Sequence, residues 1–122
     1  MKDVLIIEDN EFMRDIISTK LLEHNYTVRT APTAKIAYKK LKEQKPDVVI
    51  LDIELPDEHG FEILKKMKSD EESNSIPVII FSNNDDPDVE KEGKKLGAHD
   101  FYLKASTDPS DLVAKIATLF EE

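Results

Sequence analysis

Three short runs of apolar residues constrain the fold of this chain more than any other feature of its sequence. They occupy residues 4–7, 48–51 and 78–81 and have the sequences VLII, VVIL and VIIF. None of them alternates with polar residues, so each is expected to be buried on both faces, as in a parallel sheet covered by helices on both sides. The runs therefore predict an α/β fold with a parallel sheet.

Segments with the apolar spacing of helices lie between the runs. Asn10 and Thr33 are the expected N-caps of the first two helices, and Gly60 opens the third. The first helix is expected to end near Asn25. The inward positions of these helices are Met13, Ile16, Ile17 and Leu21, then Ala34, Ala37, Tyr38 and Leu41, then Ile63, Leu64 and Met67.

Two more strands and two more helices complete the alternation. Residues 27–30 predict a short, more exposed strand, and residues 99–103 predict the last strand. A fourth helix is expected to begin at Pro87 and end at Gly97, and a fifth to begin at Asp108. The inward positions of the fifth are Leu112, Val113, Ile116, Leu119 and Phe120. This alternation predicts one doubly wound domain over residues 1–122, with right-handed crossovers.

Composition and charge narrow the class of protein. The 122 residues are 39% hydrophobic, enough for one globular domain, and the net charge of −9 argues against direct binding of nucleic acid. Because the sequence has no cysteine, disulfides and thiolate metal sites are excluded. The N-terminal apolar run is too short for a signal peptide or a membrane span, so we expect a cytoplasmic protein with no membrane partner.

Polar residues follow four of the predicted strands, at the point where each strand ends. Glu8 and Asp9 follow the first, Asp52 the third, Ser82 the fourth and Lys104 the fifth. Ligands of open parallel sheets bind beyond the carboxyl ends of the strands, and all parallel strands end at the same edge. These five side chains are therefore expected to converge on one site.

The chemistry of this set favours phosphoryl transfer. Three carboxylates placed together repel one another unless a cation lies between them, and with no thiolate or imidazole nearby the expected ion is Mg²⁺ (or Mn²⁺). Beside such an ion Asp52 is a candidate nucleophile toward phosphorus. Lys104 would neutralise charge on the phosphoryl oxygens, and Ser82 would donate a hydrogen bond to one of them.

In four motifs the sequence resembles the receiver domains of two-component response regulators. The motifs are IEDN at residues 7–10, LDIELP at 51–56 with Gly60, FSN at 81–83 and DFYLK at 100–104. The resemblance implies a flavodoxin-like five-stranded sheet of order 2-1-3-4-5 with five helices. It also implies that Asp52 accepts a phosphoryl group from a histidine kinase or a histidine phosphotransfer protein. Such a domain is not an enzyme toward other substrates, since it catalyses only its own phosphorylation and dephosphorylation.

The resemblance also assigns roles to single residues. Glu8, Asp9, Asp52 and the backbone carbonyl of Glu54 would hold the metal, with Glu8 acting directly or through a water. Ser82 and Phe101 match the switch positions. Glu54 and Asn84, each two residues beyond a site residue, are expected to border the path of the hydrolytic water and to set the phosphoryl lifetime.

The implied output is a conformational change of the face formed by the fourth helix, fifth strand and fifth helix. A downstream protein partner or a fused output domain would read that change, and a phosphorylation-dependent dimer is a further form of output.

Three places depart from the family pattern. Around Gly60 the family commonly reads Met-Asp-Gly, whereas this chain has Glu58, His59 and Gly60, a change that affects the loop more than the chemistry. Ala105 follows Lys104 where the family usually has proline, and since a cis bond without proline costs about 3–4 kcal/mol, we expect a trans bond or a strained cis bond held by its neighbours. Phe101 lacks the hydroxyl of the commoner tyrosine, so its ring is expected to favour the buried, inward state.

Three other classes of protein fit the sequence less well. A haloacid-dehalogenase-type phosphatase needs Asp-x-Asp after its first strand, whereas this chain has IED at residues 7–9 and DIE at 52–54. A pseudo-receiver that serves only as a scaffold would not need Asp9, Asp52, Ser82 and Lys104 together. A flavodoxin would need a Ser/Thr- and Gly-rich phosphate loop after the first strand, which this sequence lacks.

Overall fold

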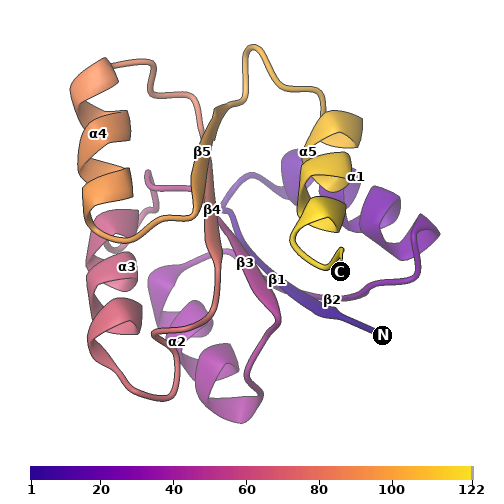
Figure 1. The fold of residues 1–122 in the computed structure, drawn as a ribbon, viewed down its shortest axis with the longest axis horizontal. Helices are drawn as coiled ribbons and strands as arrows, with labels where there is room; N and C mark the ends of the chain where they lie inside the picture. Colours follow the sequence, from indigo (N-terminus) through magenta and orange to yellow (C-terminus); the bar gives the residue numbers. More distant parts are fainter. Residues whose placement is uncertain (122) are drawn as a thin grey trace.

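Within residues 1–121, which the computed structural model describes, five parallel strands form a central layer with helices on both faces (Figure 1). The strands are β1 (Asp3–Ile7), β2 (Thr27–Ala31), β3 (Val48–Leu51), β4 (Val78–Ser82) and β5 (Asp100–Leu103). The helices are α1 (Glu11–Glu23), α2 (Ala34–Glu43), α3 (Gly60–Ser69), α4 (Pro87–Lys95) and α5 (Pro109–Thr118). The sheet order β2-β1-β3-β4-β5 confirms the predicted doubly wound, flavodoxin-like topology.

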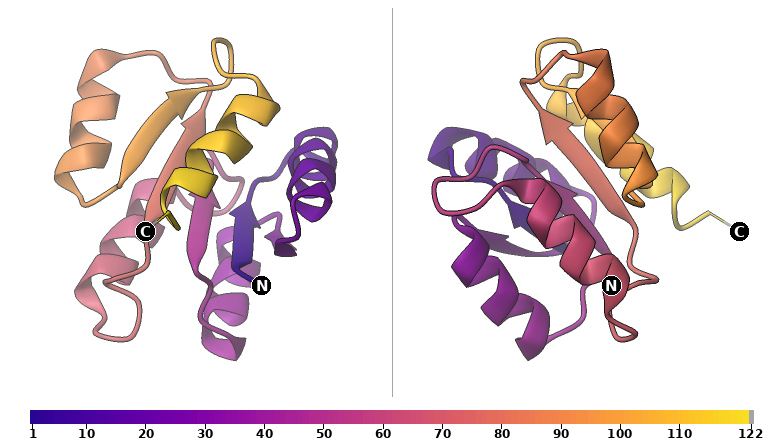
Figure 2. Two further views of the ribbon diagram at one scale, coloured as in Figure 1. Left: turned by 45° about the vertical axis from the view of Figure 1, so that its right-hand side comes forward. Right: turned by 90° about the vertical axis from the view of Figure 1, so that its left-hand side faces the viewer.

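The three apolar runs form the buried strands β1, β3 and β4, and successive residues face opposite helical layers. In β1, Val4 and Ile6 pack in a cluster with α1 and α5, whereas Leu5 and Ile7 pack with residues of α2 and α3. Helices α1 and α5 cover one face and α2, α3 and α4 the other (Figures 1 and 2). Burial on both faces is the physical reason that the runs do not alternate.

The helix starts follow the predicted caps. The side chain of Asn10 accepts a hydrogen bond from the amide of Met13 at 2.9 Å, and Thr33 caps α2 in the same way. The predicted strand 99–103 begins one residue later, at Asp100, and Asn25 has a left-handed φ of 68° just beyond α1. In residues 1–121 no helix combines the length and the apolar composition needed to cross a bilayer.

A buried ion pair fixes the amino-terminal edge of the sheet, far from the strand ends that carry the predicted site. The carboxylate of Asp3 lies 2.6 Å from Nη2 of Arg29 on the neighbouring strand. Arg29 also donates to the carbonyls of Lys40 and Gln44, at 2.8 and 2.9 Å. This network ties β1 and β2 to the end of α2, so we assign it a structural role.

Candidate functional site

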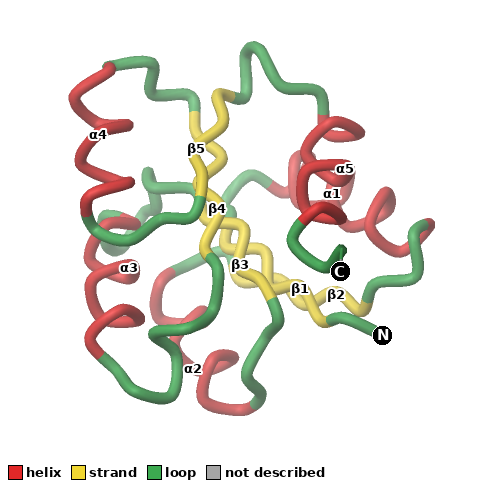
Figure 3. The backbone as a smooth tube through the Cα atoms, in the orientation of Figure 1, coloured by secondary structure: helices red, strands yellow, loops and turns green. Residues whose placement is uncertain are grey.

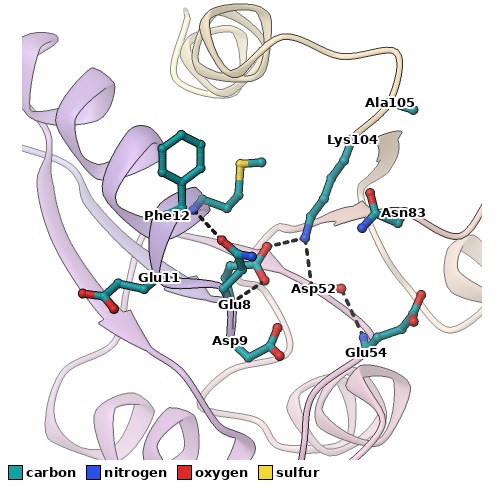
Figure 4. Close-up of a pocket in the computed structure, with 11 residues that line it drawn as sticks. Glu8, Asp9, Glu11, Phe12, Asp52, Glu54, Asn83, Lys104 and Ala105 are labelled. Carbon is teal, nitrogen blue, oxygen red and sulfur yellow. Dashed lines mark hydrogen bonds and ion pairs between the residues drawn. The ribbon is translucent and has the colours of Figure 1, made fainter.

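The loops after the strands gather at the carboxyl edge of the sheet (Figure 3). A polar pocket of about 800 Å³ opens there. It is lined by Glu8, Asp9, Asn10, Glu11, Phe12, Met13, Asp52, Glu54, Asn83, Lys104 and Ala105. Four of the five side chains predicted to converge therefore line one pocket, drawn in Figure 4. The strand-end rule accounts for this, since the residues come from the ends of β1, β3 and β5.

Three carboxylates in the pocket form a ligand set suited to a hard cation. Glu8, Asp9 and Asp52 each offer an oxygen within 4.8 Å of the oxygens of the other two. Asp9 is exposed, whereas Glu8 and Asp52 are only 3% and 6% exposed. Clustered oxygen donors, partly open to solvent, are what Mg²⁺ uses while it keeps several waters. The residues present therefore fit the predicted metal.

The backbone of Glu54 lies beside the central carboxylate. Its amide donates a hydrogen bond to Oδ1 of Asp52 at 3.1 Å, and its exposed side chain lines the pocket. The role expected for its carbonyl as a metal ligand stays a prediction.

Lys104 joins the two buried carboxylates across the sheet. Its Nζ lies 3.0 Å from Oδ2 of Asp52 and 2.5 Å from Oε1 of Glu8, and its side chain is 9% exposed (Figure 4). Burial lowers the pKa of Lys104, but pairing with Glu8 and Asp52 outweighs this and leaves the pKa above its ordinary value. Lys104 therefore remains a cation at the centre of the pocket.

Glu8 occupies the least solvated position in the set. Burial raises its pKa to about 7, although the hydrogen bond from Lys104 acts in the opposite direction. The hydrogen bond and the charge of nearby Asp52 contribute to this rise in the pKa. Near neutral pH Glu8 thus holds its proton part of the time, and a cation between the carboxylates would favour the ionised form.

Ser82 and Asn84 are not among the residues that line the pocket, all of which belong to the part of the chain that the structure describes. Ser82 is fully buried at the end of β4, and its hydroxyl oxygen accepts a hydrogen bond from the amide of Asn84 at 3.1 Å. The side chain of Asn84 in turn accepts from the amide of Asp86 at 3.0 Å. Ser82 does not line the pocket, so its contact with a phosphoryl oxygen stays a prediction.

Phe101 and Ala105, two of the departures from the family pattern, have clear places in the structure. The ring of Phe101 lies inward, 6% exposed, in the core cluster on the face covered by α2, α3 and α4. The Lys104–Ala105 bond is trans, which is the first of the two expected forms. Whether Phe101 takes part in a switch stays a prediction.

Residues of the first turn of α1 also border the pocket, which the sequence interpretation did not anticipate. Phe12 lines it and is 73% exposed, and Glu11 contributes a polar group. Asn83, in the loop after β4, contributes another. A signal was available, because a helix capped by Asn10 directly after Glu8 and Asp9 must begin at the site.

Sequence comparisons place the chain among response regulators. A model of the response regulator receiver domain matches residues 4–117. Protein PilH of Pseudomonas aeruginosa is 31% identical over 116 residues, which is 95% of each chain. A protein-glutamate methylesterase/protein-glutamine glutaminase of Bacillus licheniformis is 37% identical, and the match covers 98% of this chain but 34% of that protein. The chain thus spans only a third of the methylesterase, whose activity is not carried over to it.

Solved structures agree with this placement. The chemotaxis response regulator CheY4 of Vibrio cholerae superposes with a TM-score of 0.90 at 27% identity, over 98% of this chain and 99% of that one. The BeF3-activated receiver domain of DrrB gives a TM-score of 0.89 at 26% identity, over 100% of this chain and 99% of that one. Both likenesses extend over nearly the whole described fold, including the strand ends that carry the pocket.

Proposed function

This chain belongs to the response regulator receiver domain family, and from that premise we propose that it accepts a phosphoryl group on Asp52 in a Mg²⁺-dependent reaction. The observation that carries the proposal is the contact between Lys104 and Asp52, 3.0 Å apart beside two further carboxylates. A candidate nucleophile, a cation and three candidate metal ligands lie in one pocket, which supports the proposal.

The step we propose is an in-line displacement. A carboxylate oxygen of Asp52 forms a bond to phosphorus while the bond from phosphorus to a donor nitrogen breaks, and the nitrogen keeps the electron pair. Lys104 offsets the negative charge of the phosphoryl oxygens. Hydrolysis of the acyl phosphate by water would restore Asp52 and release phosphate.

We assign the metal to Glu8, Asp9, Asp52 and the backbone carbonyl of Glu54. A bound Mg²⁺ (or Mn²⁺) would supply electrostatic stabilisation of the phosphoryl oxygens. The three carboxylates would in turn lose their mutual repulsion.

The proposed donor is a phosphohistidine of a histidine kinase or a histidine phosphotransfer protein. Phe12 supports an approach over α1, because it lines the pocket and a second hollow of about 530 Å³ along that helix. An exposed aromatic ring beside a reactive site is a typical anchor for a protein partner.

For the output we propose a change of the face formed by α4, β5 and α5. Ser82 ends β4 just before the loop to α4, and Phe101 lies in β5, so a movement of the loop at Ser82 would reach both elements. A downstream partner, a fused output domain or a second copy of the chain would read this change.

The phosphoryl lifetime is assigned to Glu54 and Asn84. Glu54 is exposed at the pocket, where its carboxylate would meet the attacking water. Asn84 acts on the same region through the loop that it shares with Ser82.

Labelling with a small radioactive phosphodonor tests the proposal. The wild-type chain should take up label only with Mg²⁺, and Asp52→Asn should take up none, because an amide is not a nucleophile toward phosphorus. Asp85→Asn is a matched control, since Asp85 is an exposed carboxylate in the loop after β4. Uptake by Asp52→Asn at the wild-type rate, or sustained turnover of phosphate esters, would contradict the assignment.

A further inference from the structure

A groove runs between α2 and α3, on elements that the proposed phosphoryl chemistry does not use. It consists of two adjoining hollows of about 330 and 440 Å³, which share the residues Leu41, Lys42 and Ser73. We call it the α2–α3 groove. The smaller hollow is lined by Tyr38, Leu41, Lys42, Lys66, Met67 and Ser73.

The floor of the smaller hollow is apolar. Met67 is 2% exposed within the core, and the half-buried Tyr38 and Leu41 pack against the same cluster. A volume near 330 Å³ matches the lower end of small binding pockets, about 300 Å³, so the hollow is large enough for one big apolar side chain.

The smaller hollow is basic, since Lys42 and Lys66 line it with no acidic residue from the described part of the chain, whereas the larger hollow also has Glu43 and Glu72 in its lining. Helix α2 carries four lysines and one glutamate in its ten residues, in a chain of net charge −9. Lys35, Lys39 and Lys42 are exposed, and none of the ion pairs found in residues 1–121 involves them. Lys42 lines the smaller hollow, and Lys35 and Lys39 lie on the same helix. These three cations without acidic partners complement carboxylates on an incoming chain.

The loop from β3 to α3 connects this groove to the pocket. It begins at Asp52, and further along Asp57 accepts hydrogen bonds from the amides of Ala34 and Lys35 at the start of α2, at 2.9 and 3.1 Å. Asp57 therefore fixes the end of the loop nearest to α2.

Glu58 of the same loop holds two residues of the groove. Its Oε2 accepts a hydrogen bond from the hydroxyl of Tyr38 at 2.9 Å, and its Oε1 lies 3.0 Å from Nζ of Lys66. Nζ of Lys66 also lies 4.8 Å from the ring centre of Tyr38. A shift of the loop at Asp52 would thus move two lining side chains of the groove.

We propose that the α2–α3 groove binds an acidic segment of a partner protein that inserts one large apolar side chain, and that Glu58 couples this binding to the state of Asp52. The docking stands independently of the proposed function, whereas the coupling rests on it. A protein segment fits better than nucleic acid or a membrane, because the smaller hollow has the volume for one large apolar side chain, which neither a phosphate backbone nor a lipid headgroup offers.

Fluorescence anisotropy with a labelled polyglutamate peptide carrying one central phenylalanine tests the docking. Lys42→Glu should weaken binding about tenfold by replacing attraction with repulsion, and Lys39→Glu should act in the same direction. Lys115→Glu on α5 is the matched control, since it makes the same charge change at an exposed site on the other face of the sheet. Replacing the peptide's phenylalanine by alanine should also weaken binding about tenfold.

Several outcomes would overturn the docking. Lys115→Glu could weaken binding as much as Lys42→Glu, or amide shifts induced by the peptide could fall outside α2 and α3. Duplex DNA or phosphatidylglycerol vesicles could bind with the same dependence on Lys42, which would make the surface a general polyanion site.

Addition of Mg²⁺ and beryllofluoride tests the coupling. Peptide affinity should change about threefold in the wild-type chain, and typical couplings between two sites are at least this large. In Glu58→Ala, which loses both contacts of Glu58, peptide affinity should stay constant. Fluorine spectra report separately whether beryllofluoride occupies the pocket. Occupancy without a change in peptide affinity refutes the coupling alone, whereas failure of beryllofluoride to bind refutes the proposed function and leaves the peptide result intact.

Discussion

The ammonium of Lys104 lies 2.5 Å from the carboxylate of Glu8, a residue expected to bind metal. The same ammonium contacts Asp52, so one cation serves two buried carboxylates. Lys104 therefore offsets part of the negative charge of both carboxylates. Binding of a divalent cation is expected to release Lys104 from Glu8 and leave it free for a phosphoryl oxygen.

The pH dependence of stability should report the burial of Glu8. Its pKa is raised to about 7 in the folded chain. Between the ordinary carboxyl pKa and about pH 7, Glu8 is therefore protonated in the folded chain but ionised in the unfolded chain. In metal-free buffer, lowering the pH from 8 to 5 should therefore raise the free energy of unfolding of the wild type relative to Glu8→Gln. Urea denaturation of both proteins at the two pH values measures the difference. Mg²⁺ should shrink it by favouring the carboxylate, and an unchanged difference would contradict the assignment.

Removing Lys104 should expose the repulsion between its two partners. Lys104→Met leaves Glu8 and Asp52 buried without a cation, and loss of one partner of a buried pair typically costs about 3 kcal/mol. The loss in unfolding free energy should be greatest near pH 8 and smaller at pH 5, where Glu8 is protonated, and Mg²⁺ should restore part of it. Lys115→Met, at an exposed position of α5, is the control and should have little effect. Equal losses at both pH values would argue against an electrostatic cause.

Gly60 should tolerate no side chain, because the start of α3 packs directly on the loop that carries Asp52. A Cβ at Gly60 would lie 2.5 Å from Cα of Ile53 and 2.8 Å from the carbonyl oxygen of Asp52, both backbone atoms. Gly60→Ala should therefore destabilise the fold by about 2–3 kcal/mol and weaken Mg²⁺ binding.

Gly93→Ala is the matched comparison for Gly60→Ala. There the closest atom, at 2.9 Å, is Cδ1 of Ile80, the movable end of a side chain, and the gain in helix propensity of about 1 kcal/mol offsets the crowding. Thermal unfolding of both variants, with metal titrations, checks the contrast. Similar losses of stability at the two positions would show that contact with the loop is not the cause of the destabilisation.

The strand ends of the site could be predicted because they follow from the backbone alone. Once residues 4–7 and 48–51 form parallel strands, Glu8 and Asp52 must reach the same edge of the sheet. The same logic placed Lys104 after β5. The apolar runs predict the strands, and the parallel direction of the strands predicts the edge of the sheet at which the site lies.

The contacts within the site and around its loops could not be predicted in this way. Whether Lys104 pairs with Glu8, and whether the hydroxyl of Ser82 turns toward Asn84, depends on side-chain rotamers that the surrounding packing selects. Glu58 is a polar loop residue in the sequence, and its partner Tyr38 lies 20 positions away, so no local pattern indicates the contact. Long-range side-chain contacts of this kind emerge only from the folded structure.

Phe101 should remain buried when the pocket is occupied. Its ring is 6% exposed and carries no hydroxyl, so an outward position would expose apolar surface and gain no hydrogen bond in return. With fluorine-labelled phenylalanine, the Phe101 resonance should keep the same low solvent exposure before and after addition of Mg²⁺ and beryllofluoride. Phe12, which is 73% exposed, provides the reference for a solvated ring in the same spectra. If the Phe101 ring becomes as exposed as that of Phe12 on activation, burial does not set its position, and the inward preference inferred from the missing hydroxyl is wrong.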